Sequence, residues 1–328
     1  MSKKLTAQIP VHQLISNMEG QNYWLNGCIE FLMECLHEDK AYDYWFFSGV
    51  TGDSFTQIFS KKPENMTLCY SDSFPAESVK RAFYACGYNY DYYDDINEGC
   101  RKELDRRIRE YIDKNIPVIA RVNDVFHSYA IICGYDDSAL YYILGENKEP
   151  AAYTYDQLLF VTDKKAKPPL ADVYKESVMR IPSIFSMAET DEYSFGKQAF
   201  IDWAESLTDG RYDPIPDNDK LWHTHESPEF CCWNMHGTYL CILGTNLCAV
   251  EFLKEALRLN PDMTFINRLL PLFDKINHDG FNALIGAEGG FHMKPEVFKN
   301  KTKMKPLRDK ILALLEYCDK ILDVFNTL

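Results

Sequence analysis

Cys28 and His127 are the two residues whose chemical types and positions could support nucleophilic catalysis. Cys28 follows Gly27 in the segment NGCIEFLMECL, where apolar residues recur with helical spacing, so we expect it in the first turn of a helix. The N-terminus of a helix and a nearby imidazolium both lower the pKa of a thiol. Because the thiolate is the form that attacks a carbonyl carbon, the two residues could act as nucleophile and base.

His127 precedes the apolar segment SYAIICGY (128–135), whose composition is typical of a strand buried on both faces. The residues from Asp136 to Ala139 form a turn signal, and LYYILGEN (140–147) predicts the return strand of a hairpin. A third group that orients the imidazole would lie at the end of that return strand, where Glu146 and Asn147 are both candidates.

Each residue of the pair also has a simpler interpretation. A cysteine on an apolar helical stripe is usually a packing residue, and a histidine at the end of a strand is usually held by structural hydrogen bonds. The two residues together favour catalysis more than either does alone.

The order of a helix-borne cysteine, a long excursion, a strand-borne histidine and a GYDD turn resembles the papain-like fold of bacteriocin-processing cysteine peptidases. Over about residues 10–165, the chain is most similar to the N-terminal domain of the butirosin-biosynthesis acyltransferase family. The resemblance is carried by NGCIEFLMECL, YDYWFFSGVTGDSF, IREYIDKNIPVIARV and HSYAIICGYDDSALYYILG. It implies a papain-like domain with an antiparallel sheet, and acyl transfer as its chemistry.

Papain-like enzymes usually place a glutamine six residues before the cysteine, where its amide donates a hydrogen bond to the oxyanion. Here Asn22 has that spacing and Gln21 precedes it. An asparagine offers the same amide donor on a side chain that is one methylene shorter. Asn22 or Gln21 is therefore the predicted oxyanion donor, and the neighbouring Trp24 is a candidate substrate contact.

The predicted reaction is acyl transfer without a cofactor. Cys28 would attack an amide or thioester carbonyl, and His127 would move the proton. With water as acceptor the protein would be a peptidase or amidase, and with an amine it would be an acyltransferase. The expected partners are a small-molecule or peptide substrate and, for transfer, an acyl carrier protein. The alternative is a catalytically inactive papain-like protein that binds a peptide or small metabolite in the same cleft.

Composition limits the partners and the compartment. The net charge of −14 disfavours nucleic acid or an anionic membrane surface as the main partner, and it would attract cationic substrates. Acidity is also an ordinary means of keeping a protein soluble. The 11 cysteines are scattered without scaffold spacing, which indicates reduced thiols. Without an apolar run of eighteen residues or an N-terminal signal core, a cytoplasmic protein is expected.

The length of 328 residues favours two domains. The segment TDKKAKPPLADVYK (162–175) is rich in Lys and Pro and is typical of a linker. We therefore expect an α+β protein, with a papain-like domain over 1–165 and an all-helical domain over 166–328. In the last predicted helix, apolar residues recur every three or four positions from Leu307 to Phe325. The exposed face of this helical domain is a candidate surface for a homodimer.

The segment HTHESPEFCCWNMH (223–236) raises the alternative of a zinc site. Its spacing matches no standard finger, and two adjacent cysteines do not easily reach one ion, so we expect a connecting segment and no metal. The segment could instead line the cleft, with Trp222 or His225 touching substrate. Ser54 of GVTGDSF is a further candidate substrate contact, although the motif lacks the GxSxG elbow of hydrolases.

Overall fold

The computed structural model describes residues 3–4, 14, 20–62, 69–73, 75–122, 129–145, 151–211, 213, 228–245, 248–287 and 295–328. The chain divides into two compact units, of which the first comprises Met1–Thr51 and Ala76–Pro169 and the second Gly52–Pro75 and Leu170–Leu328. Both contain helices and antiparallel strands, which confirms the predicted α+β class. The division differs from a single boundary at 165/166, because 52–75 belongs to the second unit.

The first unit is built on an antiparallel sheet with the strand order β3-β8-β4-β5-β6-β7, and β1 pairs with β5 as well. The strands are β1 (Lys3–Lys4), β3 (Tyr88–Tyr93), β4 (Val118–Val122), β5 (Tyr129–Tyr135), β6 (Leu140–Leu144), β7 (Ala151–Ala152) and β8 (Tyr155–Lys164). Strands β5 and β6 form the predicted hairpin. Its turn is held by the carboxylate of Asp136, which accepts hydrogen bonds from the backbone N–H groups of Ser138 and Ala139.

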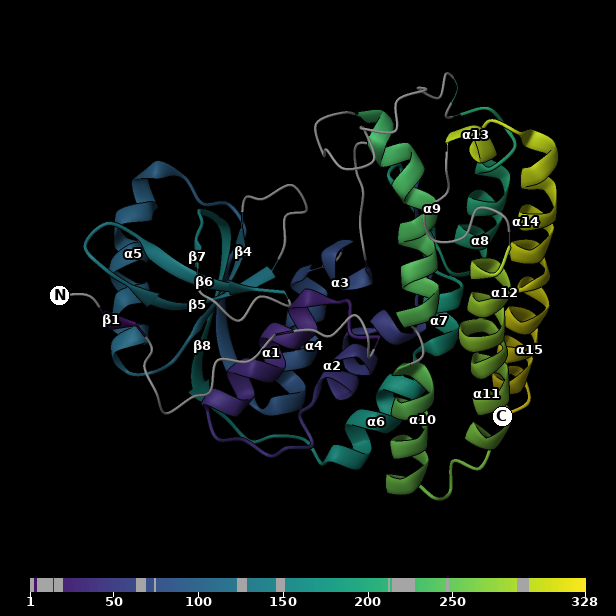
Figure 1. Cartoon of the computed structure of the whole chain (residues 1–328). Coiled ribbons are helices and arrows are strands. Elements are labelled where there is room, and N and C mark those ends of the chain that lie inside the picture. The colour runs from purple at the N-terminus through teal and green to yellow at the C-terminus, as the bar shows by residue number, and fades with distance from the viewer. Residues whose placement is uncertain are drawn as a thin grey trace. The chain divides into compact units, whose positions relative to one another are not determined.

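Helices cover both faces of this sheet (Figure 1). Helix α5 (Glu98–Asp113) begins after Asn97, whose side chain caps the first turn. It packs on one face against alternate strand residues, a cluster that includes Leu104, Ile108, Ile112, Ala120, Ala130, Ile132, Leu158 and Phe160. Helix α1 (Trp24–Cys35) packs on the opposite face of the sheet, against β4 and β5. Since side chains alternate along a strand, the residues between those of the α5 cluster face α1.

Two further helices complete the first unit. Helix α2 (Tyr44–Thr51) packs against α1, and α4 (Pro75–Cys86) follows the second-unit segment that contains the short helices η2 (Asp53–Phe55) and α3 (Tyr70–Ser73). Phe83 of α4 contacts the ring of Tyr90 of β3 at a centroid distance of 5.2 Å.

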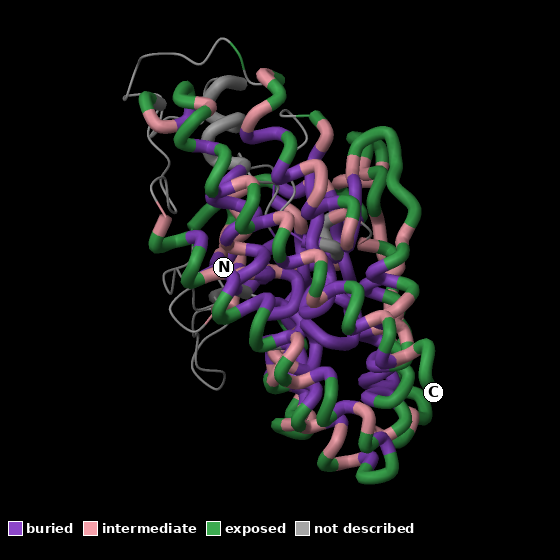
Figure 2. The backbone as a smooth tube through the Cα atoms, turned by 90° about the vertical axis from the view of Figure 1, so that its right-hand side faces the viewer, coloured by how far each residue is buried: buried purple, intermediate pink, exposed green. Residues whose placement is uncertain are grey.

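The second unit is mainly helical. Its α-helices after Pro169 are α6 (Leu170–Met179), α7 (Ile181–Phe185), α8 (Gly196–Ser206), α9 (Pro228–Thr245), α10 (Cys248–Leu259), α11 (Ile266–Asp274), α12 (Phe281–Ile285), α13 (Pro295–Phe298), α14 (Lys301–Ala313) and α15 (Leu315–Asn326). Buried and exposed positions alternate along its helices (Figure 2). The apolar stripe predicted at the C-terminus is buried at Leu307, Ile311, Leu314, Cys318 and Ile321, although Leu314 divides the predicted helix in two.

The prediction that 166–328 is all helical is wrong in one detail. Strand β9 (Tyr193–Phe195) pairs antiparallel with β2 (Ile58–Ser60), so the second unit has a two-stranded sheet. The partner strand comes from the segment 52–75, far away in the sequence. Within the described residues, no helix combines the length and the apolar character that crossing a membrane requires.

Pro271 lies inside α11, where the sequence predicts a kink or break. The helix continues beyond it and changes at Lys275 to a π-helix, η4 (Lys275–Gly280), before α12 begins. Because proline has no backbone N–H, it leaves the carbonyl four residues before it without its helical partner.

Candidate active site at one end of the sheet

Cys28 lies in the second turn of α1, and the prediction that it occupies the first turn is wrong. Helix α1 begins at Trp24, and the backbone N–H of Gly27 already bonds to the carbonyl of Tyr23. The reason is a long-range contact, because the backbone N–H of Tyr23 donates to the hydroxyl of Tyr44 at 3.0 Å and fixes the chain one turn earlier. The unpaired N–H groups of the helix start therefore lie before Cys28.

The Cys28 side chain is fully buried, with 0% of its surface exposed. Burial raises the pKa of this thiol well above its ordinary value. In the structure described, Cys28 is thus a neutral thiol rather than a preformed thiolate.

Helix α1 is aligned so that Cys28 lies toward the start of β5. Helix α1 packs on β5, and at the other end of the helix the neighbouring Cys133 contributes, after burial and Glu34, to the raised pKa of Cys35, which places the end of α1 beside the second half of β5. From Cys35 back to Cys28 the helix rises by about 10 Å. From Cys133 back to Tyr129 the strand extends by about 13 Å. The N-terminal end of α1 accordingly lies near the end of the sheet where β5 begins (Figure 1).

Three strands meet at that end of the sheet. Arg121 pairs with Tyr129, so β4 ends where β5 begins, and Ala130 pairs with Leu144, so β6 ends there too. In the chain, His127 precedes Tyr129 by two residues, and Glu146 and Asn147 follow Leu144 closely. The predicted base and both orienting candidates lie outside the described residues.

A row of polar side chains crosses the α1 face at this end of the sheet. It consists of Tyr92, Arg121, Tyr129 and Gln157, one from each of β3, β4, β5 and β8, and is called the polar row below. Arg121, Tyr129 and Gln157 alternate with Ala120, Ala130 and Leu158 of the α5 cluster, and Tyr92 pairs with Leu159 on the same face. Local sequence patterns do not single out these four residues as a group, although Arg121 is a charge inside the apolar strand VIARV.

The amide of Gln157 connects the polar row. One side of it lies 2.7 Å from the Tyr92 hydroxyl and 3.1 Å from the Tyr129 hydroxyl. The other side lies 3.1 and 3.2 Å from two nitrogens of Arg121. A guanidinium only donates, so the amide oxygen faces Arg121 and the amide nitrogen donates to the two hydroxyls.

A β-bulge fixes the guanidinium of Arg121. The register between β4 and β8 shifts after Arg121, which pairs with Gln157, so that Val122 pairs with Tyr155 and Asp156 is the extra residue. Asp156 accepts two hydrogen bonds from Arg121, at 2.9 and 3.0 Å. This bidentate pair raises the pKa of Arg121 despite its partial burial, so the cation persists at all physiological pH values.

The predicted oxyanion donors Gln21 and Asn22 precede α1, and Trp24 is its first residue; all three are half-buried. They belong, with Cys28, to one short stretch of the first unit. The predicted substrate contacts Trp222 and His225 lie outside the described residues.

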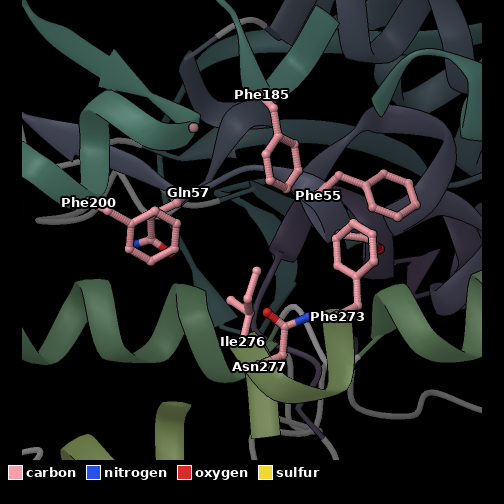
Figure 3. A pocket seen from close by; sticks show the side chains of 9 residues that line it. Phe55, Gln57, Phe185, Phe200, Phe273, Ile276 and Asn277 are labelled. Atoms are coloured by element: carbon pink, nitrogen blue, oxygen red, sulfur yellow. The ribbon is translucent and has the colours of Figure 1, made fainter. Parts of the chain in front are cut away.

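Ser54 belongs to the second unit, where it lines a small cavity together with four phenylalanine rings (Figure 3). The amides of Gln57 and Asn277 also line it, and Gln57 Oε1 has no hydrogen-bond partner among the described residues. The cavity measures about 280 Å³ including its open mouth, and its closed part holds about one water molecule. Ser54 belongs to a different unit from Cys28, and its role as a substrate contact therefore stays a prediction.

The proposed zinc segment contributes one described side chain, His236. It is buried, and its Nδ1 accepts a hydrogen bond from the indole of Trp203 at 3.0 Å. Burial lowers the pKa of His236 to about 3, so it is a neutral packing residue. Among the side chains that the structure describes, no three potential ligands come together as a metal site.

Glu30 lies on α1, two residues after Cys28. Burial and the nearby Asp43 and Glu34 raise the pKa of its carboxyl to about 8. The unfolded chain releases this proton near pH 4.5, whereas the folded protein holds it until about pH 8. The free energy of unfolding therefore falls as the pH rises between these values. Replacing Glu30 by Gln should remove this loss and stabilise the protein by about 2 kcal/mol at pH 8.5.

Urea unfolding at pH 5 and pH 8.5 measures this effect, which should be near zero at the lower pH. The exposed Glu98 at the start of α5 is the matched control, because it does not contribute to the raised pKa of Glu30, and Glu98→Gln should change the stability by less than about 1 kcal/mol and equally at both pH values. An equal effect of Glu30→Gln at both pH values would contradict the assignment.

The sequence matches no protein-family model, and no curated protein matches it. Function has to be inferred from the residues of the site themselves.

Proposed function

We propose that the first unit is a papain-like, thiol-dependent acyl-transfer domain in which Cys28 is the nucleophile and His127 the base. The proposal rests on one observation: three features lie at the same end of the sheet. The N-terminal half of α1 carries Cys28 toward this end, the chain enters β5 there just after His127, and it leaves β6 there just before Glu146.

In the proposed reaction, His127 takes the proton of the neutral Cys28 thiol as the sulfur attacks an amide or thioester carbonyl. A carbon–sulfur bond forms, and Asn22 or Gln21 donates a hydrogen bond to the oxyanion. The bond to the leaving amine or thiol then breaks, and His127 returns the proton to that group. Water or an amine releases the acyl group by the same steps in reverse, and Glu146 or Asn147 orients the imidazole throughout.

The substrate proposed is a small acyl compound or a peptide, and a thioester donor would be presented by an acyl carrier protein. The net charge of −14 favours an amine as acceptor, because a protonated amine is attracted to an acidic surface. A reducing cytoplasm suits the proposal, since the nucleophile has to remain a thiol and no disulfide joins the described cysteines.

The complete burial of Cys28 favours a second candidate, a catalytically inactive papain-like protein that binds a peptide or small metabolite. A neutral thiol without access to solvent is a good packing residue. The two candidates differ in one measurable property, which is whether His127 activates Cys28.

Alkylation by iodoacetamide, followed by peptide mass spectrometry, measures that property without knowledge of the substrate. We expect Cys28 to react faster at pH 7 than Cys35 and Cys86, which are buried thiols of the same unit with pKa values that burial also raises. His127→Ala should slow Cys28 by at least about tenfold and leave the other two unchanged. Equal reactivity of the three thiols, with or without His127, would favour the binding protein.

A further inference from the structure

We infer that the Tyr92 hydroxyl donates a hydrogen bond to a carbonyl oxygen of the substrate, and that Arg121 polarises this donor through the amide of Gln157. The inference rests on the proposed function, because it adds a substrate contact to the same site. It starts from the direction of the hydrogen bonds in the polar row.

Arg121 sets the direction in which the hydrogen bonds of the polar row are donated, and this direction cannot reverse. The guanidinium is held by Asp156 on the bulge, and it has no acceptor atom. The oxygen of Gln157 must therefore accept from Arg121, at 3.1 and 3.2 Å. The nitrogen of the same amide is then committed to donating, and it lies 2.7 Å from the Tyr92 hydroxyl oxygen and 3.1 Å from that of Tyr129.

The two hydroxyls consequently act as acceptors toward Gln157. The Tyr92 hydroxyl oxygen thus receives a hydrogen bond from the amide nitrogen of Gln157, and its own hydrogen points away from Gln157. A chain of donors that begins at a cation strengthens each following hydrogen bond, which makes the Tyr92 hydroxyl a good donor at the end of the chain.

The hydroxyl is protonated and within reach of a ligand. Burial raises the pKa of Tyr92 to about 12, so it is a neutral phenol at physiological pH. The side chain is half-buried rather than enclosed, and it lies on the face of the sheet that α1 covers. Such a donor fits an uncharged acceptor, the carbonyl oxygen of an amide, ester or thioester, because the positive charge of Arg121 is already balanced by Asp156.

Gln157→Glu provides a test in which the fold and the shape are kept. A carboxylate in this position accepts from Arg121 and from both tyrosine hydroxyls, so it turns the Tyr92 hydrogen inward without leaving a buried group unpaired. A purely structural role of the polar row would be preserved or strengthened by this change. Recognition of a carbonyl by Tyr92 would be lost.

The experiment measures kcat and KM with p-nitrophenyl acetate as acyl donor, together with Tm, for the full-length protein. We expect Gln157→Glu and Tyr92→Phe each to lower kcat/KM by about tenfold or more, with no fall in Tm for Gln157→Glu. Tyr90→Phe is the matched control, because Tyr90 lies on the same strand and packs on Phe83 outside the polar row. Its kcat/KM should equal that of the wild type.

A Cys28→Ala variant separates the two levels of the proposal. If turnover depends on Cys28 but Gln157→Glu and Tyr92→Phe keep wild-type kcat/KM, the Tyr92 contact is refuted and the proposed function stands. If the wild type shows no turnover above the Cys28→Ala background, both are refuted together.

Discussion

Replacing Cys28 by alanine should reduce kcat/KM for acyl transfer by at least about a thousandfold. In the proposed reaction, the Cys28 sulfur forms the covalent bond to the acyl group. Removal of the nucleophile from comparable enzymes leaves only the small rate that binding and oxyanion stabilisation provide. Turnover of p-nitrophenyl acetate, with and without a primary amine as acceptor, measures the loss.

Cys35→Ala is the matched control, because Cys35 is a second buried thiol on the same helix. Each substitution removes one sulfur atom from the core and should cost about 1–2 kcal/mol of stability, which leaves the fold intact. Cys35→Ala should therefore keep wild-type kcat/KM. Equal activity of the two variants would show that Cys28 only packs.

Replacing Gly196 by alanine should destabilise the second unit by about 3 kcal/mol. Gly196 begins α8 with φ of +53°, and its N–H donates to the carbonyl of Gln57 at 2.9 Å. An added Cβ would overlap the carbonyl oxygen of Phe185, which is a backbone atom and cannot rotate away. The left-handed conformation adds its own cost for any residue with a Cβ.

Urea unfolding of Gly196→Ala measures this cost. Gly20→Ala isolates the conformational part, because Gly20 has φ of +78° and no described atom within 4 Å of an added Cβ. It should lose only about 1 kcal/mol. Similar losses for the two variants would mean that the contact with Phe185 relaxes freely.

Local patterns in the sequence were sufficient to predict the hairpin that follows His127. The apolar run of β5, the turn at Asp136 and the return strand β6 depend on residues close together in the chain. The same holds for the buried stripe near the C-terminus, where the spacing of Leu307, Ile311 and Cys318 is enough.

The start of α1 could not be predicted in this way. Gly27 resembles a helix boundary locally, but the chain is fixed earlier by the bond between Tyr23 and Tyr44, which are 21 residues apart. Cys28 consequently lies in a buried turn rather than an exposed one. This difference changes its chemistry from a thiolate stabilised by the helix end to a neutral thiol that needs a base.

The polar row and the second-unit strand β2 depend on pairing over longer distances. Arg121 pairs with Gln157 in the register that begins at Ile119, and the bulge that follows makes Asp156 the extra residue beside Arg121; a single sequence reveals neither the register nor the bulge. In the same way, β2 finds its partner β9 more than 130 residues later. No local pattern in the segment 52–75 indicates that it belongs with the C-terminal helices.

Direct detection of the acyl-enzyme tests the central claim most sharply. The protein would be mixed with p-nitrophenyl acetate at pH 7, quenched in acid within seconds and digested for peptide mass spectrometry. We predict an acetyl group on Cys28 that disappears when a primary amine is added before the quench, and that never forms in His127→Ala. Acetylation confined to lysines or to other cysteines, with Cys28 unmodified in the wild type, would contradict the assignment of Cys28 as the nucleophile.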